Sequence, residues 1–331
     1  MNTKKNIALV FGGDSSEAEV SERSAANVLD WIDAARYTPY MVRMVRGDWQ
    51  VQRPDRRSSV PVLKSDFSAE LDGQKVSFDV ALIVIHGAPG ENGVLQAYFD
   101  VLGVPYTTCS AFVSALTFNK FACKAYIAHT GVAMAKSQLV RRDEAINPHA
   151  LAQQLGLPLF VKPNNGGSSF GITKVKHAAD LQAALDKALA DDGEALVEEF
   201  IGGVEVTCGA MSLNGIETVL PVTEVVSQNE FFDYGAKYEG MSDEITPARI
   251  GAEATALVQR TTQLLYRRLG CSGIVRIDYI LRHGTPYFLE INTVPGMTAA
   301  SFIPQQIIAA KMEMTDTISL LIEDACNRHK H

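Results

Sequence analysis

Short apolar runs and longer amphipathic segments alternate along this 331-residue chain. The apolar runs are rich in Val, Ile, Leu and Phe and end close to Gly or Pro, which is typical of buried strands. They lie at residues 7–11, 80–85, 159–162 and 196–200. The amphipathic segments have helical spacing and lie at residues 18–34, 111–130, 181–190 and 252–269. This order of strands and helices predicts an α/β (α+β) fold.

Two glycine-containing stretches interrupt the alternation and predict domain boundaries. Residues 103–110 mix Gly, Pro, Thr and Ser, and Gly202 and Gly203 follow the last of the apolar runs. The chain is also long for a single core, so two or three domains are expected. We predict an N-terminal α/β domain at 1–109, a central domain at 110–200 and a C-terminal domain at 201–331.

Two alternating runs near the C-terminus predict a β-hairpin. They span residues 273–281 and 286–292 and flank a turn that contains Gly284. A hairpin centred on Gly284 sets Asp278 directly opposite Glu290. Because side chains alternate between the faces of a sheet, the two carboxylates then point the same way.

Opposed carboxylates at roughly 5 Å repel each other by about 3 kcal/mol when the effective dielectric constant is about 20. The same register sets Arg276 opposite Asn292 on the same face, so one compensating cation is close. Carboxylate and amide oxygens are also the hard ligands that Mg²⁺ prefers, with phosphate oxygens completing the shell. The hairpin therefore predicts a magnesium site. The alternative is a solvent-exposed face of salt bridges, which the apolar character of both strands disfavours.

A Gly- and Ser-rich loop at residues 161–171 follows another predicted strand. Its backbone N–H groups can turn onto a phosphate, and Lys162 can reach an α- or β-phosphate from the end of the strand. The loop is neither a Walker A motif nor a GxGxxG fingerprint. A surface loop without function is the alternative, and Lys120 by itself is only a lysine on a helix.

The turn at residues 12–21 has two interpretations. Ser16 and Glu19 are three residues apart, as in a capping box, which would be purely structural. Alternatively, Glu19 lies at the C-terminal edge of the sheet, where open α/β sheets bind ligands, and pairs with a substrate ammonium. His86 ends the second predicted strand at the same edge and opens a glycine-rich loop, although a single histidine is more often structural.

Three further segments give weaker signals. Residues 198–201 end a strand at a predicted boundary, where backbone groups can meet an adenine edge and Glu205 can meet ribose hydroxyls. Residues 230–240 mix aromatics, charges and glycines without periodicity, as in a lid that excludes water or in a loop packed by its own aromatics. The Pro-Gly turn after the hairpin offers the Gly296 N–H to an oxyanion, or it is an ordinary turn.

Composition narrows the functional classes. The formal charge is −8, the pI is near 5.4 and no Lys/Arg run exceeds two residues, which argues against nucleic-acid binding. Five scattered cysteines without CxxC spacing indicate neither a zinc site nor a disulfide framework and fit a reducing compartment. The first apolar run is too short for a signal peptide or a membrane span, so we expect a cytoplasmic protein.

The ordered set of these segments resembles the ATP-grasp superfamily and, within it, the D-alanine–D-alanine ligases. The resemblance covers nearly the whole chain. Its carriers are GGDSSEAEVS (12–21), HGAPGENG (86–93), VKPNNGGSSFG (161–171), FFDYGAKY (231–238), RIDY (276–279) and EINTVPGMT (290–298). Each segment is modestly specific alone, whereas the set in this order is highly specific.

The resemblance implies a three-domain ATP-grasp ligase, with an N-terminal Rossmann-like parallel sheet and two α+β domains that clamp ATP. ATP would phosphorylate the carboxylate of one D-alanine, and the amine of a second D-alanine would attack the acyl phosphate. Two Mg²⁺ ions, replaceable by Mn²⁺, would be held by Asp278, Glu290 and Asn292. Family membership further implies a homodimer, no membrane or nucleic-acid partner, and a role in peptidoglycan precursor synthesis.

The resemblance also implies roles for individual residues. The nucleotide would contact Lys120, Lys162, Ser168, Ser169, Glu198, Glu199, Ile201, Glu205 and Lys237. The substrates would contact Glu19, His86 and Ser301. The catalytic set would be Glu19, Ser168, Tyr238, Lys237, Arg276 and Gly296. In this set Glu19, Ser168 and Tyr238 would close the lid by hydrogen bonds, and Arg276 with the Gly296 N–H would stabilise the tetrahedral oxyanion.

Two other functions are compatible with parts of this pattern. The first is another ligase with the same mechanism, such as one that makes D-alanyl-D-lactate, although the Lys237–Tyr238 pair favours a dipeptide product. The second is a nucleotide-binding module without activity. Such a module should have lost a metal ligand or Arg276, and the sequence retains them all.

Overall fold

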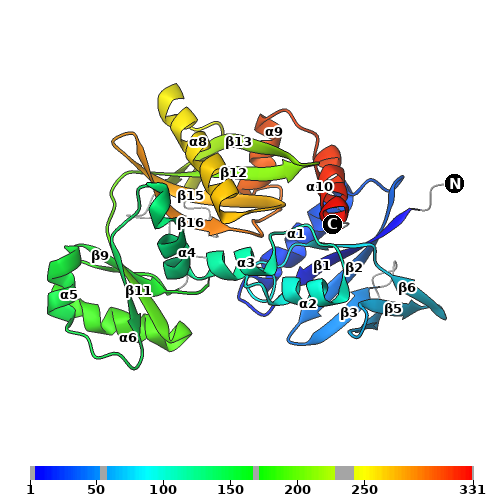
Figure 1. Ribbon diagram of the computed structural model, residues 1–331, viewed down its shortest axis with the longest axis horizontal. Coiled ribbons are helices and arrows are strands. Elements are labelled where there is room, and N and C mark those ends of the chain that lie inside the picture. Colours follow the sequence, from blue (N-terminus) through cyan, green and yellow to red (C-terminus); the bar gives the residue numbers. More distant parts are fainter. Residues whose placement is uncertain (1–3, 53–57, 167–170, 228–241, 330–331) are drawn as a thin grey trace.

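The computed structural model describes residues 4–52, 58–166, 171–227 and 242–329. These residues form three β-sheets with helices packed against them, so the predicted α/β (α+β) class is confirmed. The first and second sheets lie at opposite ends of the molecule, and the third lies above and between them (Figure 1). Within the described ranges, no helix combines the length and the apolar character needed to cross a membrane.

The first sheet has parallel and antiparallel parts. Its strands are β1 (Lys5–Gly12), β2 (Tyr37–Val45), β3 (Asp48–Gln52), β4 (Ser59–Leu63), β5 (Ser68–Leu71), β6 (Gln74–Ser77) and β7 (Val80–Ile83). They are arranged in the order β6-β5-β4-β3-β2-β1-β7. Strands β2, β1 and β7 pair in parallel, as expected of a Rossmann-like unit, and β3 to β6 continue the sheet antiparallel.

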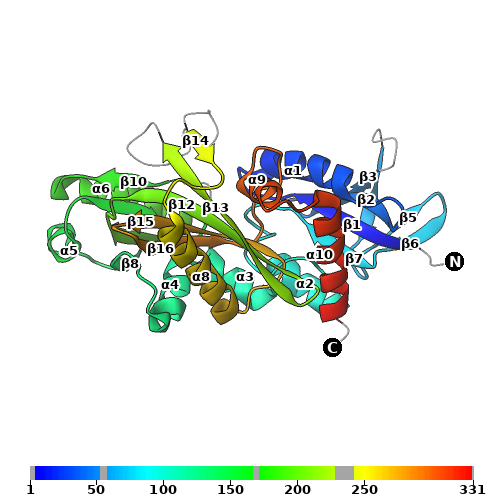
Figure 2. The ribbon, with the colours of Figure 1, turned by 90° about the horizontal axis from the view of Figure 1, so that it is seen from above.

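Helices cover both faces of this sheet. On one face Leu9 lies in a core with Val28 of α1 (Ala18–Trp31) and Ile322 of α10 (Met314–Arg328). On the other face Val10 lies in a core with Phe99 of α2 (Val94–Leu102). Helices α1 and α10 contact each other although they belong to opposite ends of the sequence, and α10 runs across the direction of α1 (Figure 2). Helix α10 therefore covers part of one face of the first sheet.

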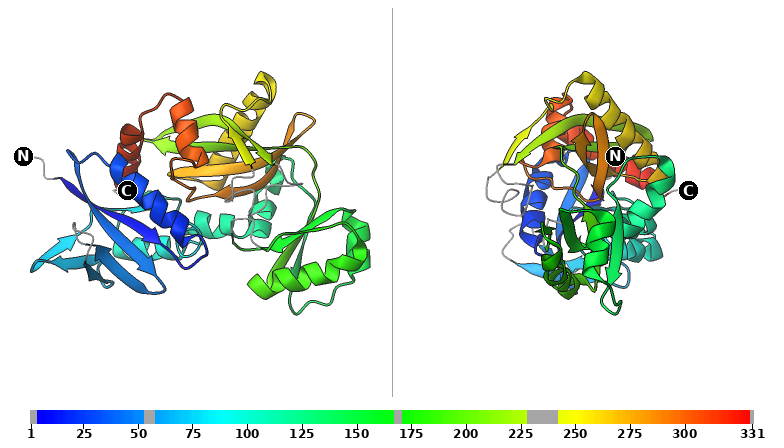
Figure 3. Two further views of the ribbon diagram at one scale, coloured as in Figure 1. Left: turned by 180° about the vertical axis from the view of Figure 1, so that it is seen from behind. Right: turned by 90° about the vertical axis from the view of Figure 1, so that its left-hand side faces the viewer.

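The second sheet is a small antiparallel unit. Its strands are β8 (Ser137–Arg141), β9 (Leu159–Pro163), β10 (Thr173–Val175) and β11 (Glu194–Glu199), in the order β10-β9-β11-β8. Helices α5 (Pro148–Leu155) and α6 (Leu181–Asp192) pack on it through Leu151 and Leu185. Seen from behind, this unit projects from the rest of the molecule (Figure 3).

The third sheet is antiparallel and has helices on both faces. Its strands are β12 (Val204–Leu213), β13 (Ile216–Ser227), β14 (Ser242–Ile245), β15 (Ile274–Arg282) and β16 (Thr285–Asn292), in the order β14-β13-β12-β15-β16. Helix α8 (Ala252–Leu269) packs on one face through Val258 and Leu265. Helix α9 (Phe302–Ala309) packs on the other through Ile303 and Ile307.

The helix predicted at residues 111–130 is divided. Its parts are α3 (Ala111–Phe118), α4 (Lys120–Ile127) and a 3-10 turn at Ala128–Thr130. Asn119 separates the first two because its backbone is extended and its side chain accepts the N–H of Ala122 at 2.8 Å, which caps α4. Helix α4 lies in a core with α8 and the third sheet, through Cys123 and Ile127.

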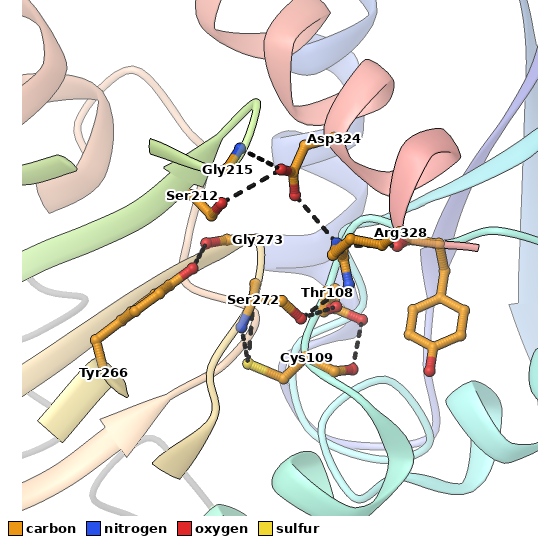
Figure 4. A network of polar contacts seen from close by, with 10 residues as sticks. Thr108, Cys109, Ser212, Gly215, Tyr266, Ser272, Gly273, Asp324 and Arg328 are labelled. Atoms are coloured by element: carbon orange, nitrogen blue, oxygen red, sulfur yellow. Dashed lines mark hydrogen bonds and ion pairs between the residues drawn. The ribbon is translucent and has the colours of Figure 1, made fainter. Parts of the chain in front are cut away.

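A polar network joins the last helix to the first and third sheets (Figure 4). The guanidinium of Arg328 donates to Asp324 Oδ2 at 3.0 Å, to Ser272 Oγ at 2.9 Å and to the carbonyl of Tyr106 at 3.2 Å. Asp324 Oδ1 in turn accepts from Ser212 Oγ at 3.2 Å and from the Gly215 N–H at 3.1 Å. One arginine thus connects segments that are distant in sequence.

We expect Arg328→Ala to lower the free energy of unfolding by about 2 kcal/mol, because the buried Asp324 loses its charge partner and two other acceptors lose a donor. Urea unfolding followed by circular dichroism measures this. Arg268→Ala, on an exposed turn of α8, is the matched control and should change the value by less than about 0.5 kcal/mol. Equal effects of both substitutions would contradict the assignment.

Candidate functional site

A cleft of about 710 Å³ lies where the three sheets approach one another. Its walls come from the turn after β1, the loop after β7, the strand ends of the second sheet and the β15–β16 hairpin. The predicted site residues that line it are Lys120, Lys162, Glu198, Glu199, Ile201, Glu205, Asp278 and Glu290. Ser168, Ser169, Lys237 and Tyr238 lie outside the described residues. The structure therefore gathers those predicted nucleotide residues that it describes with two of the three predicted metal ligands.

The β15–β16 hairpin has the predicted register at the site, but it reaches that register differently. Asp278 pairs with Glu290 and Arg276 with Asn292. The turn itself is a two-residue turn, and a β-bulge next to Asp278 shifts the register by one residue. As a result Leu289 and Glu290, which are neighbours in sequence, both line the cleft. The bulge brings the second carboxylate onto the cleft wall.

Asp278 lies at the centre of a dense set of donors. Arg276 donates to both of its oxygens, from Nε at 2.8 Å and from Nη2 at 2.7 Å. Thr207 Oγ1 donates to Oδ1 at 2.6 Å, and Asn292 Nδ2 donates to Oδ2 at 3.0 Å. Both Arg276 and Asp278 are 8% exposed. This bidentate pair neutralises one of the two opposed carboxylates, so the repulsion expected from the sequence is largely offset.

The donor set on this wall suits Mg²⁺. Asp278 and Glu290 present carboxylate oxygens toward the same cleft, and Asn292 adds an amide beside them. Among the described residues, no three His, Cys, Asp or Glu side chains cluster closely enough to hold a metal by themselves. A divalent cation here would accordingly need oxygens from a bound phosphate, as Mg²⁺ sites that serve nucleotides usually do.

Glu198 lies buried between two lysines. Its Oε2 is 2.5 Å from Lys162 Nζ, and its Oε1 forms an ion pair with Lys124. Burial works against ionisation of Glu198, but the two ammonium groups outweigh it and hold the pKa at about 2. Lys162 is raised in pKa because Glu198 and Glu290 outweigh its burial. The Glu198 carboxylate therefore holds the Lys162 ammonium in place, and both residues line the cleft.

Lys120 begins α4 beside the glycine-rich loop. Its backbone N–H donates to the carbonyl of Asn164 at 3.0 Å, and its ammonium donates to the carbonyl of Gly166. The ammonium also lies 3.8 Å from Glu290 Oε2. Burial lowers the pKa of Lys120, and Glu290 opposes that shift only in part. The Lys120 ammonium is thus held at the cleft wall, where it can bind an anionic group such as a phosphate.

The strand end at residues 199–201 forms another part of the wall. The backbone N–H of Glu199 donates to the carbonyl of Lys136 at 3.0 Å, and its Oε1 accepts the N–H of Lys136 at 2.8 Å. These bonds fix the segment that follows β11, where Ile201 is 8% exposed. Glu205, near the start of β12, faces the same cleft.

Gly296 and Ser301 lie next to each other in the loop between β16 and α9. A Cβ at Gly296 would meet Ser301 Oγ at 2.8 Å. The Ser301 hydroxyl accepts the N–H of Thr298 at 3.1 Å and lies 2.8 Å from Thr298 Oγ1. Although Ser301 is the N-cap residue of α9, its side chain does not cap the helix. The Ser301 side chain thus lies against the Gly296 backbone, and neither residue is among the described residues that line the cleft.

The turn after β1 differs from the capping-box interpretation, which is wrong. Helix α1 begins after Glu17, and no side chain caps it. Ser15 Oγ instead accepts the Glu17 N–H at 3.2 Å and donates to the His86 carbonyl at 2.9 Å. Glu17 lines the cleft, whereas Glu19 is exposed on α1 and is not among the described residues of the lining.

His86 is buried rather than open to the cleft. Its side chain is 4% exposed, with Nδ1 2.7 Å from the carbonyl oxygen of Val294 and Nε2 3.0 Å from Ser24 Oγ. His86, which was predicted to bind substrate, therefore uses both ring nitrogens in contacts with other residues of the protein.

Sequence reasoning did not identify four residues of this region. Lys124 lies one helical turn after Lys120, a spacing that could have identified it. Thr207 is paired with Asp278 across β12 and β15, which only the sheet order reveals. Glu17 and Glu91 lie in segments without periodicity, so no sequence pattern identifies them.

Two family models match the chain. The model described as D-ala D-ala ligase N-terminus matches residues 6–109, and the model described as D-ala D-ala ligase C-terminus matches residues 126–323. A curated D-alanine–D-alanine ligase of Phocaeicola vulgatus is 50% identical over 322 residues, which cover 97% of this chain and 99% of the relative.

Two solved structures illustrate the likeness in three dimensions. The VanG D-Ala:D-Ser ligase of Enterococcus faecalis has a TM-score of 0.87 and 32% identity, covering 98% of this chain and 100% of its own. The D-alanine–D-alanine ligase of Bacillus anthracis complexed with ATP has a TM-score of 0.78 and 26% identity, covering 98% and 99%.

We expect Lys124→Met to lower the free energy of unfolding by about 3 kcal/mol at neutral pH, because buried Glu198 loses one of its two cations. Glu198 has a depressed pKa, so its contribution is complete above the ordinary pKa of a glutamate and is lost as the pH falls toward 2. The difference between variant and parent should therefore shrink in acid. Chemical unfolding at several pH values measures it, with the exposed Lys187→Met as control. A difference that stays constant down to about pH 3 would refute the pairing.

Proposed function

Since the chain belongs to the D-alanine–D-alanine ligase family, we propose that it joins two molecules of D-alanine into D-alanyl-D-alanine while ATP is cleaved to ADP and phosphate. The observation that carries the proposal is the cleft wall on which Asp278 and Glu290 oppose each other beside Lys120 and Lys162. Opposed carboxylates and paired lysines suit a metal-bound polyphosphate.

The nucleotide would lie along the cleft between the second and third sheets. Lys120 and Lys162 would hold phosphates, and the Ser168 and Ser169 region of the glycine-rich loop would close over them. Adenine would lie against the segment of Glu198, Glu199 and Ile201, with Glu205 at the ribose. In this arrangement Glu198 acts through its ion pair with Lys162, and Lys237 would reach the transferred phosphoryl group.

Magnesium would be held by Asp278, Glu290 and Asn292 as two ions, for which Mn²⁺ can substitute. When bound, the ions would neutralise charge on the transferred phosphoryl group. The protein's part is to keep the donor oxygens on one wall, which the paired register of β15 and β16 supports.

The reaction would have two covalent steps. A carboxylate oxygen of the first D-alanine attacks the γ-phosphorus of ATP, and the bond to ADP breaks, which leaves a D-alanyl phosphate. The amine of the second D-alanine then attacks the acyl carbon, gives up a proton and expels phosphate. Arg276 and the Gly296 N–H would stabilise the oxyanion formed in between.

Substrate orientation would come from the rim of the cleft. Glu17, which lines the cleft where Glu19 does not, would pair with the first ammonium, and Ser168 and Tyr238 would hold the lid closed. Ser301 would bind the second carboxylate. His86 would act on the substrates indirectly, by holding the loop that carries Gly296. We further propose that the enzyme works in the cytoplasm as a homodimer, supplies peptidoglycan precursors and needs no membrane or nucleic acid.

D-Serine is a second candidate for the acceptor. The observation that favours it is the 32% identity to a D-Ala:D-Ser ligase over almost the whole chain. Both acceptors carry an amine, a carboxylate and a small side chain, so they can use the same Ser301 contact. Competition between D-alanine and D-serine would rank them.

We expect phosphate release from ATP and Mg²⁺ when D-alanine is the only amino acid, with one dipeptide formed per phosphate. L-Alanine should give none. A coupled phosphate assay with chromatographic detection of the dipeptide measures both. Absence of release with D-alanine would contradict the proposal, and a screen of D-serine and D-lactate would then identify the acceptor.

Glu290→Gln should lower kcat by at least about 100-fold and weaken Mg²⁺-dependent binding of ADP, because one of the opposed carboxylates is lost. Binding measured by calorimetry with and without Mg²⁺ separates metal from nucleotide effects. Glu244→Gln, on β14, is the matched control. Normal turnover by Glu290→Gln would refute the metal assignment.

A further inference from the structure

Two loops from different sheets contact each other, and Gly87 and Ala88 of the first loop line the cleft. One follows β7 and spans residues 86–93, and the other follows β16 and spans residues 292–298. The second loop carries Gly296, whose N–H is the proposed oxyanion donor. The position of the Gly296 N–H relative to the substrates therefore depends on the contacts that hold the two loops together.

Glu91 ties the loops with one carboxylate group. Its Oε2 accepts the N–H of Gly87 at 2.6 Å, within its own loop. Its Oε1 accepts the N–H of Val294 at 3.2 Å, in the opposite loop. The two oxygens thus accept from two different loops, which follow strands of different sheets.

His86 and Ser24 secure the same loop from the other side. Since the carbonyl of Val294 can only accept, His86 Nδ1 carries the proton of that 2.7 Å bond, and Nε2 accepts the hydroxyl proton of Ser24 at 3.0 Å. Ser24 Oγ in turn accepts the N–H of Met297 at 3.1 Å. The loop is therefore held at both polar groups of Val294 and at Met297, on either side of Gly296.

The environment makes a carboxylate at Glu91 costly. Burial raises the pKa of Glu91 to about 7, and the negative charge of Glu17 adds to the shift. The two backbone N–H groups and, more weakly, Arg276 oppose it. Glu91 is not among the described residues that line the cleft. Its geometry suits the support of a loop.

We propose that Glu91 is a positioning residue that fixes the Gly296 loop for the second step, in which the amine attacks the acyl phosphate. This inference rests on the proposed ligase function. In the proposed mechanism the first step uses Lys120, Lys162 and the metal ligands, and the Gly296 N–H is assigned to the second step alone. Loss of Glu91 therefore affects the ligation more than the phosphorylation.

Glu91→Gln tests this with little change of shape. A glutamine has one oxygen acceptor, so its amide group must face one of the two N–H donors and that tie is lost. We expect kcat for dipeptide to fall about 100-fold, as for small misplacements of catalytic groups, with an unchanged KM for ATP. Phosphate released per dipeptide should rise above one, because acyl phosphate that is not attacked by the amine reacts with water.

The matched control is Glu22→Gln, an exposed glutamate of α1 beside Arg43 that should leave all three quantities unchanged. If Glu91→Gln does not fold, Ser24→Ala removes a single hydroxyl from the same support and should raise the phosphate-to-dipeptide ratio with a smaller loss of kcat.

Two results would overturn the proposal: a ratio of one with parental kcat in a folded variant, or a loss of kcat with a higher KM for ATP. Failure of the proposed function is distinguishable, because the parent protein would then make no dipeptide from D-alanine.

Discussion

The opposition of Asp278 and Glu290 across two adjacent strands is the constraint on which the site depends. Like charges in that position are tolerated only when cations compensate them, and the structure supplies these in two ways. Arg276 forms a bidentate pair with Asp278 within the hairpin, and Lys120 approaches Glu290 from helix α4. The wall is therefore close to neutral yet keeps oxygens that face the cleft.

The lysines extend this balance to the second sheet. Lys120 and Lys162 approach Glu290 and Glu198, and Lys124 shares Glu198 from the same helix as Lys120. Helix α4 belongs to the core of the third sheet, whereas Glu198 belongs to β11. The ion pairs thus connect the two sheets at the floor of the cleft, so the charges that suit a nucleotide also hold its two walls in place.

Sequence reasoning succeeded where a strict period constrains the chain. The alternation in β15 and β16 identified the hairpin, and centring it on Gly284 paired Asp278 with Glu290, which the structure confirms although the turn lies elsewhere. It did not reveal the bulge that aligns them, since bulges depend on packing across the whole sheet. The break at Asn119 was hidden for a similar reason: its cap matters only because α4 contacts Asn164 in another unit. Glu91 and His86 acquire their contacts from a loop about 200 residues away, which no local pattern encodes.

The packing of α10 on the first sheet has a consequence for biosynthesis. Ile7 and Leu9 leave the ribosome more than 300 residues before their core partners Ile318 and Ile322. Part of one apolar face of the N-terminal sheet must therefore remain uncovered until α10 has been synthesised. Such a surface is prone to association with other nascent chains, so we expect this protein to depend on chaperones during translation more than its size alone would require.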